Sequence, residues 1–198
     1  MLFSRRSTGI KFYLQTGQLT MAARGKTICF IDNANIFHGQ QGAGWRIDWE
    51  KFISYLEREG EIWQTHIFAS EHDPPLQSET SFYQFLKEQL RWEVSLYPLG
   101  LKTITCASCD HRHTVPAEKG VDVGLATRML MLAMNQAYET AILVAGDSDY
   151  LETVKFVKGY GLRVEVVAWR KGLSDALADE SSEPVLLLDS LRKELEKN

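Results

Sequence analysis

Strand-like and helix-like segments alternate along the chain from residue 26 onward. Residues 27–31 form a short apolar run rich in strand formers, as expected for a strand covered on both faces. Asp48 is a capping residue type, and after it apolar side chains recur at helical spacing until Gly60. The first pattern recurs and predicts further strands over 62–69, 94–97, 140–145, 162–168 and 185–188. The second predicts a helix that begins at about residue 78 and others over 121–136, 149–158 and 174–179. The alternation predicts an α/β fold, a three-layer α/β/α sandwich with a mostly parallel central sheet.

Three segments need a separate interpretation. Residues 98–120 show no clear periodicity, and we expect a long loop there. Residues 121–136 are apolar on nearly every side and predict a buried helix in which the methionines fill the core. Residues 39–44 are rich in glycine but lack the lysine of a phosphate-binding loop, so we expect a flexible loop there.

The chain of 198 residues is long enough for one well-packed domain. Residues 1–31 contain five basic side chains and no acidic one. That bias is typical of a flexible extension or an upstream start codon, and also of an organelle-targeting peptide. We expect a flexible basic extension over 1–25, one domain over 26–190 and a tail over 191–198.

Composition and charge exclude some classes of protein. An apolar fraction of 44% is that of a globular chain, and no apolar run approaches the roughly 18 residues that span a bilayer, so we expect no membrane partner. A net charge of −4 argues against a protein that coats nucleic acid through a basic surface, but not against a nuclease with an acidic site. Three cysteines without a signal peptide favour a reducing compartment, and we expect a cytoplasmic protein.

Carboxylates follow the predicted strands at the ends where parallel sheets bind ligands. Asp32 comes directly after the first strand, Asp147 and Asp149 follow the strand over 140–145, and Asp122 begins the helix over 121–136. Each has a structural alternative: Asp147 as a helix cap, Asp122 as a partner of the helix dipole and Asp32 as a turn residue. Their shared position at one edge of the sheet favours a common site.

Several carboxylates held close together repel one another unless a cation lies between them. Oxygen ligands of this kind suit Mg²⁺ or Mn²⁺, which take the rest of their coordination from water and substrate phosphate. A metal so placed activates water and offsets charge on a leaving oxygen. The pattern therefore predicts hydrolysis of a phosphodiester.

The segments over 30–35, 119–122 and 145–150 resemble the three acidic motifs of the NYN domain, a branch of the PIN-like ribonucleases. The resemblance runs from about residue 26 to 188. It implies a PIN-like fold of Rossmann-like architecture, RNA as the substrate, and Mg²⁺ or Mn²⁺ held by four catalytic carboxylates. These are Asp32, Asp122, Asp147 and Asp149.

Polar and basic side chains beside the motifs are candidates for binding the substrate. Lys119 precedes Asp122 by three residues, at a helix start that itself favours phosphate. Asn35 would be a polar neighbour of the metal site, and we assign Asn33 and Ser148 to the substrate side with it.

A cysteine–histidine cluster lies within the long irregular segment. Cys106 and Cys109 have the Cys-x-x-Cys spacing of structural zinc sites, and His111 or His113 could complete a tetrahedron. A site made from so short a segment would be cramped. Alternatives are a Zn²⁺ site shared by two copies in a homodimer, a decayed knuckle, or histidines that contact RNA.

Two other functions compete with a ribonuclease. A phosphatase of the haloacid-dehalogenase class also begins with an aspartate after the first strand, but it needs an acid two residues later, where this chain has Ala34. A non-catalytic module that binds RNA or a protein partner on the same fold is the stronger alternative, since metal binding does not require turnover.

Overall fold

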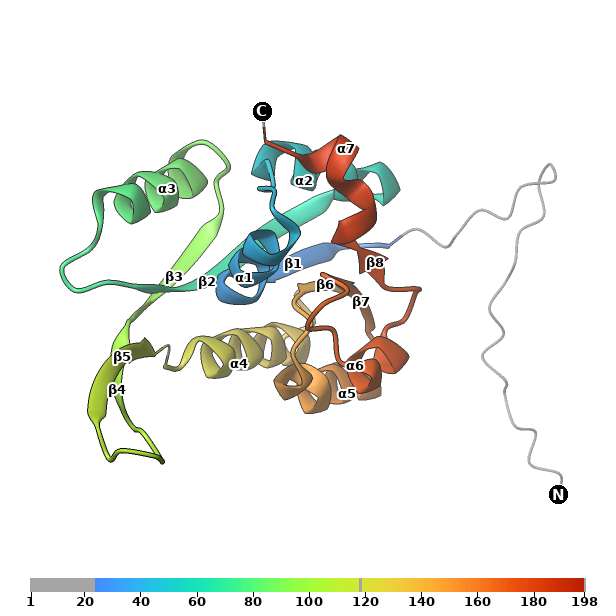
Figure 1. Cartoon of the computed structure of the whole chain (residues 1–198). Coiled ribbons are helices and arrows are strands. Elements are labelled where there is room, and N and C mark those ends of the chain that lie inside the picture. Colours follow the sequence, from blue (N-terminus) through green and yellow to red (C-terminus); the bar gives the residue numbers. More distant parts are fainter. Residues whose placement is uncertain (1–23, 118, 198) are drawn as a thin grey trace, which may run out of the picture.

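The structure, a computed structural model, describes residues 24–117 and 119–197. A six-stranded sheet forms its centre, in the order β3-β2-β1-β6-β7-β8 with every neighbouring pair parallel (Figure 1). The strands are β1 Thr27–Asp32, β2 Ile62–Glu71, β3 Glu93–Pro98, β6 Thr140–Val144, β7 Arg163–Ala168 and β8 Leu186–Leu187. The predicted extension over 1–25 lies outside the described residues, except for its last two positions.

Helices cover both faces of the sheet and make the three predicted layers. One face packs against α1 Asn33–Ala43, α2 Trp49–Leu56, α3 Gln77–Glu88 and α7 Arg192–Leu195. The other face packs against α4 Val121–Met134, α5 Leu151–Gly159 and α6 Asp175–Glu180. Short 3₁₀ helices are η1 Glu57–Glu59, η2 Ser148–Tyr150 and η3 Leu188–Leu191.

Among the described residues, no helix is long and apolar enough to cross a membrane. The predicted α/β/α fold class is confirmed.

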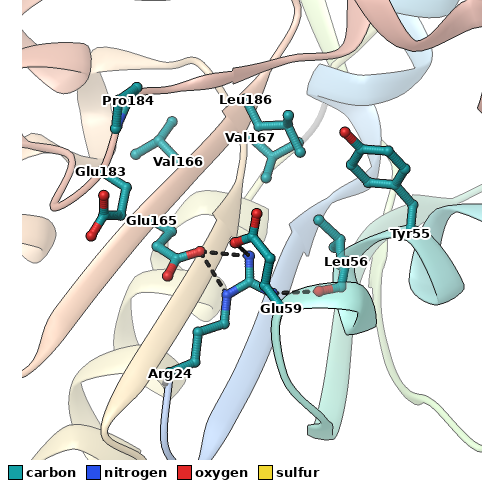
Figure 2. A pocket seen from close by; sticks show the side chains of 10 residues that line it. All are labelled: Arg24, Tyr55, Leu56, Glu59, Glu165, Val166, Val167, Glu183, Pro184 and Leu186. Carbon is teal, nitrogen blue, oxygen red and sulfur yellow. Dashed lines mark hydrogen bonds and ion pairs between the residues drawn. The ribbon is translucent and has the colours of Figure 1, made fainter. Parts of the chain in front are cut away.

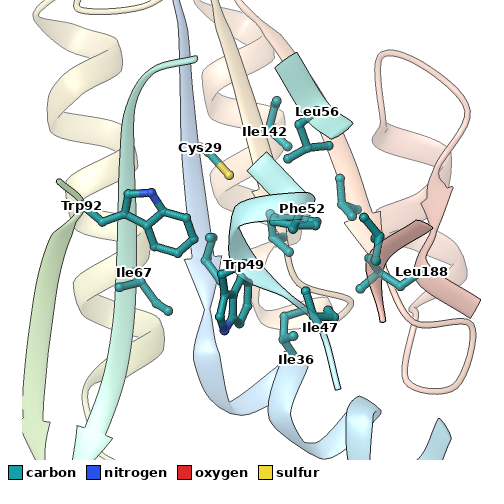
Figure 3. Close-up of a cluster of buried hydrophobic side chains, with 14 of the residues drawn as sticks. Cys29, Ile36, Ile47, Trp49, Phe52, Leu56, Ile67, Trp92, Ile142 and Leu188 are labelled. Carbon is teal, nitrogen blue, oxygen red and sulfur yellow. The ribbon is translucent and has the colours of Figure 1, made fainter. Parts of the chain in front are cut away.

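Two hydrophobic clusters hold these layers together, and β1 contributes to both. Its side chains alternate, so Cys29 and Ile31 join the cluster beneath α1 and α2 (Figure 3). Ile28 and Phe30 join the cluster beneath α4 and α5. Burial of successive residues on opposite faces explains why the sequence of β1 is a continuous apolar run.

Helix α2 forms where the sequence predicts it. The Asp48 carboxylate accepts hydrogen bonds from the backbone N–H groups of Glu50 and Lys51 and so caps the first turn. The apolar positions at helical spacing are buried, with Trp49 packed edge-on against Trp92 of the segment before β3 (Figure 3).

The prediction of a flexible loop over 39–44 is wrong, because most of this segment belongs to α1. Asp32 caps that helix and Ile36 is fully buried beneath it. A Cβ atom at Gly39 would lie 1.9 Å from the ring of Trp169, so glycine here permits close packing of the helix against that ring. Gly44 ends the helix in the left-handed conformation that glycine adopts without strain.

The prediction of a long irregular loop over 98–120 is also wrong. Strands β4 Gly100–Thr105 and β5 Arg112–Ala117 form an antiparallel hairpin that projects from the body of the molecule (Figure 1). From Leu101 to Thr105 every residue of β4 is exposed. Both faces of β4 are therefore solvated, and the apolar alternation that would reveal such a strand in the sequence is missing.

Helix α4 is less buried than its composition predicts. Leu125 and Met129 lie in the core, whereas the side chains of Val123, Met131 and Met134 are 69%, 54% and 57% exposed. The sheet covers only one side of α4, so the opposite side faces solvent however apolar it is. The predicted role of the methionines as core residues holds for Met129 alone.

Residues 191–197 of the predicted tail over 191–198 are part of the fold. Leu191 and Leu195 are buried in the cluster beneath α1 and α2. The backbone N–H of Asp48 donates to the Leu195 carbonyl at 2.8 Å, and that of Lys197 donates to the Arg46 carbonyl at 2.9 Å. The few apolar residues in this charged segment were too sparse to indicate a docked helix.

Arg24 also belongs to the fold, although the sequence assigned it to the extension. Its guanidinium lies in a pocket of about 200 Å³ at the end of the sheet where β1 begins (Figure 2). It donates to Glu165 at 2.9 Å, to Glu59 at 3.0 Å and to the carbonyl oxygen of Leu56. The Arg24 and Glu165 side chains are only 7% and 10% exposed, so each charge depends on the other for its compensation.

We predict that Arg24→Ala lowers the free energy of unfolding by about 3–5 kcal/mol, because it leaves the Glu165 carboxylate buried without its partner. Urea denaturation of wild type and variant measures the change. Arg58→Ala is the matched control, since the Arg58–Glu194 pair is exposed and its loss costs no more than about 1 kcal/mol. Equal effects of the two substitutions would contradict a structural role for Arg24.

His66 is a buried titratable group in the middle of β2. Its ring stacks on Phe30 at a centroid distance of 5.5 Å and on Phe68 at 6.4 Å. Its Nε2 atom has no hydrogen-bond partner within the described part of the chain. Burial, together with the positive charge of Arg128, lowers the pKa of His66 to about 4.

This lowered pKa predicts a pH-dependent stability. The unfolded chain takes up a proton at His66 near the ordinary pKa of 6.5, whereas the folded chain resists it until about 4. The contribution is therefore complete above the ordinary pKa and is lost as the pH falls toward about 4. We expect His66 to account for a loss of about 2 kcal/mol between about pH 7 and about pH 5. Urea titrations of His66→Phe at both pH values should show a free energy of unfolding that lacks this loss. If the variant loses as much stability as wild type between the two pH values, His66 is not its source.

Candidate active site

The strand order reverses between β1 and β6, and the acidic motifs gather at that point. Asp32 is the last residue of β1, whose register places Ile31 beside Val144 at the end of β6. The turn that carries Asp147 and Asp149 begins just after Val144. Ligands of open parallel sheets bind beyond the carboxyl ends of the strands at such a reversal.

Asp32 is almost fully buried, with an exposed fraction of 4%. Its Oδ1 atom accepts the backbone N–H of Asn35 at 3.1 Å and so caps α1. Its Oδ2 atom accepts the hydroxyl of Tyr150 at 2.9 Å. Burial raises the pKa of Asp32 above its ordinary value, and the charge of Asp122 adds to the rise, while the two hydrogen bonds oppose it.

Tyr150 connects Asp32 to Asp122, two carboxylates 90 positions apart in sequence. Its hydroxyl lies 3.1 Å from Oδ1 of Asp122, in the first turn of α4, as well as 2.9 Å from Asp32. A phenol has one proton to donate, so it satisfies only one carboxylate at a time. Burial, and then the two neighbouring carboxylates, raise the pKa of Tyr150 well above its usual range.

The sequence did not reveal the role of Tyr150. It directly follows Asp149, but it also begins the row of buried residues that continues with Val154 and Val157 in α5. From sequence alone, a tyrosine at this spacing is indistinguishable from a residue that only fills the core. The hydroxyl of Tyr150 reaches two carboxylates only because β1, α4 and η2 lie side by side in the folded chain.

Asp147 and Asp149 lie on the exposed turn between β6 and α5. Oδ1 of Asp147 accepts the backbone N–H of Asp149 at 3.1 Å and lies 3.4 Å from the hydroxyl of Ser148, so the alternative role of Asp147 as a cap is confirmed. The helix predicted over 149–158 is divided into η2 and α5. Within the residues described, no hydrogen bond joins either aspartate to Asp32 or Asp122.

Asn35 has a structural task. Its Oδ1 atom accepts the backbone N–H of Gly146 at 3.1 Å, which fastens the start of α1 to the turn after β6. This hydrogen bond therefore keeps the end of β1, which carries Asp32, close to the turn that carries Asp147. Asn33 is the first residue of α1 and is partly exposed beside it.

Lys119 lies between the hairpin and α4 and is exposed. Its aliphatic carbons lie beside Gly100, 3.2 Å from the position that a Cβ atom would take there. Gly120 follows at φ 81°, a left-handed conformation that turns the chain into α4. The structure thus places Lys119 just before the helix that carries Asp122, with no hydrogen bond to the four aspartates in the part of the chain it describes.

The four aspartates supply only oxygen donors, which is the chemistry that Mg²⁺ and Mn²⁺ prefer. Asp32 and Asp122 fit such an ion best, since their oxygens already converge on a single hydroxyl. Across residues 24–117 and 119–197, no three acidic, histidine or cysteine side chains stand in an arrangement that could hold a metal ion. Two carboxylates suffice for such an ion when water and substrate phosphate complete its coordination.

The cysteine–histidine cluster lies apart from these carboxylates, at the tip of the β4–β5 hairpin (Figure 1). The Sγ atom of Cys106 lies 3.0 Å from the hydroxyl of Ser108. Hydrogen bonds from Ser108, and then from Cys109, lower the pKa of the Cys106 thiol to about 7. Cys109, His111 and His113 are exposed.

Known families and solved structures include some that are similar to this chain. Residues 26–188 match the family model of the NYN domain. A crystal structure of a protein of unknown function from Vibrio parahaemolyticus is similar, with a TM-score of 0.65 and 18% identity over 88% of this chain and 99% of that one. The C-terminal domain of a hydrogenase from Pyrococcus furiosus gives a TM-score of 0.42 and 16% identity over 78% of this chain and 99% of that one. Among curated proteins, none matches.

Gly146 offers a test of how tightly the acidic turn is held. A Cβ atom there would lie 2.7 Å from the carbonyl oxygen of Gly172 and 3.0 Å from Cα of Leu173, both of them backbone atoms. We predict that Gly146→Ala lowers the free energy of unfolding by about 1–3 kcal/mol, because the turn must shift to admit the methyl group. Chemical denaturation measures the loss.

Gly42→Ala is the matched control. Gly42 lies in α1, and a Cβ atom added to it would meet nothing within 4 Å, so alanine there should leave stability unchanged or raise it by up to about 1 kcal/mol. If Gly146→Ala behaves in the same way as Gly42→Ala, the close approach at the acidic turn does not constrain the site.

Proposed function

The chain belongs to the NYN domain family, a PIN-like nuclease family, and from this premise we propose that it hydrolyses RNA phosphodiester bonds with Mg²⁺ or Mn²⁺. The reaction would take place at the carboxyl edge of the sheet, between β1 and β6. One observation carries the proposal. Asp32 and Asp122, from two separate acidic motifs, reach the same buried hydroxyl at 2.9 Å and 3.1 Å.

This arrangement favours a cation. Two carboxylates share one donated proton at Tyr150, and burial next to a second carboxylate disfavours the ionised form of Asp32. Positive charge between Asp32 and Asp122 would offset both effects. If these residues served only to hold the fold together, an amide or hydroxyl side chain in place of Asp32 or Asp122 would do so without bringing two negative charges together.

Asp32 and Asp122 would hold the ion, and Asp147 and Asp149 would approach from the neighbouring turn. When bound, the ion would supply activation of a water molecule and compensation of charge on the phosphate. Tyr150 would position the two carboxylates, and Asn35 would hold the turn through Gly146. Lys119, just before α4, would pair with a backbone phosphate of the substrate.

The test is cleavage of end-labelled single-stranded and structured RNA in Mg²⁺, in Mn²⁺ and in EDTA. Asp122→Asn is the sharpest variant, because Asp122 is exposed and its replacement spares the buried cap made by Asp32. We expect cleavage only with metal, and a loss of at least about 100-fold in the variant, since metal ligands support several kcal/mol of transition-state stabilisation. Asp147→Asn should also reduce cleavage.

Glu88→Gln is the control, since it makes the same chemical change on the exposed side of α3. It should cleave as fast as wild type. RNA binding that persists in EDTA, without cleavage by wild type in either metal, would replace the proposal with a non-catalytic RNA-binding module. Cleavage that survives in Asp122→Asn would move the chemistry away from this edge of the sheet.

A further inference from the structure

The β4–β5 hairpin brings two cysteines and two histidines to one face. Register pairs Ile104 with His113, and one step beyond the paired strands Cys106 donates its N–H to the carbonyl of His111 at 2.8 Å. Directly opposed residues of antiparallel strands project to the same face, and so do residues two apart on one strand. Cys106, His111 and His113 therefore share a face, and the two imidazoles stack at 6.4 Å.

The turn at the tip returns Cys109 to the same place. The N–H of Asp110 donates to the Cys106 carbonyl at 2.9 Å, and Asp110 takes the left-handed conformation at φ 52°. The turn closes over Cys106, whose thiol is within hydrogen-bond reach of Cys109. Two thiols and two imidazoles thus surround one end of the hairpin.

We propose that this tip binds one Zn²⁺ per chain, through Cys106, Cys109, His111 and His113. Two thiolates and two imidazoles are a usual tetrahedral ligand set for structural zinc, and two thiols three positions apart have the spacing of such sites. A site within so short a segment is feasible because the side-chain alternation of β5, which extends back to His111, directs both histidines toward the Cys106 side.

The hairpin itself gives an independent reason for a metal. A lone two-stranded hairpin is at best marginally stable in water. This one joins no other strand of the described sheet, and residues 101–105 and 107–114 are exposed. Burial therefore contributes little to holding it, and a bound metal would supply the missing free energy, as it does in small metal-dependent folds.

Binding would require side-chain rotation. In the part of the chain that the structure describes, no three of these side chains are already set around a common point. The backbone positions are in place, and Cys109, His111 and His113 are exposed, so their side chains have room to rotate once the two imidazoles unstack. The site is distinct from the carboxylates of the proposed nuclease and does not depend on that function.

Zinc content of the full chain, purified without a histidine tag, tests the proposal by elemental analysis. We expect about one zinc per chain in wild type, and less than roughly a tenth in Cys109→Ser and in His111→Ala. Co²⁺ in place of zinc should give the visible absorption of a tetrahedral thiolate site in wild type but not in Cys109→Ser or His111→Ala. His38→Ala, which removes an exposed histidine from α1, is the control and should keep its zinc.

Hydrogen exchange provides a readout that needs no activity. Amides over residues 100–117 should exchange slowly with zinc and rapidly after EDTA, whereas exchange in β1 and β6 should not change. Folding of Cys109→Ser is checked by its unfolding midpoint, which the exposed tip should leave as in wild type.

Three results would overturn the proposal. The first is that the wild-type protein contains less than roughly a tenth of an equivalent of zinc and also fails to bind Co²⁺. Another is zinc that remains in Cys109→Ser. The third is about half a zinc per chain in a particle of dimer mass by light scattering, which would assign the ligands to a site shared by two copies.

Discussion

Every residue of β1 is buried, and both edges of the strand are hydrogen-bonded, to β2 on one side and to β6 on the other. The interior of β1 carries no charged side chain, and the carboxylate of Asp32 lies at the end of the strand. The strand order reverses beside β1, so the helices that leave β1 and β6 diverge to opposite faces of the sheet. Asp32 and Asp122 approach each other at that divergence, which is where open parallel sheets bind ligands.

Tyr150 makes the electrostatics of this point unusual. Its ring is part of the core beneath α4 and α5, while its hydroxyl emerges between Asp32 and Asp122. Packing therefore fixes the hydroxyl, and the hydroxyl in turn fixes the separation of two like charges. A buried hydroxyl with one proton cannot fully satisfy two carboxylates. This shared proton, together with the burial of Asp32, is the physical basis of the proposed cation at this position.

The central part of the fold could be predicted from sequence because burial on both faces leaves a continuous apolar run, as in β1 and β6. The predictions failed where burial was one-sided or slight. Exposed β4 has no apolar alternation, and α7 is held by few residues, chiefly Leu195. The positions of Asp32 at the end of a strand and of Asp122 in the first turn of a helix were predictable from sequence, and their joint role in a metal site stays a prediction. The roles of Tyr150 and Asn35 were not predictable, since each depends on a contact between elements distant in sequence.

The hairpin and the acidic edge are joined by the chain but held by different forces. β5 leads through Lys119 and Gly120 into α4, which carries Asp122. Helix α4 is anchored by its own buried residues, Val121 and Leu125 among them, and by packing of Gly124 against Tyr97. Gly120 separates that anchored helix from the exposed strands with a left-handed turn. We therefore expect ordering of the hairpin tip to leave the position of α4 unchanged.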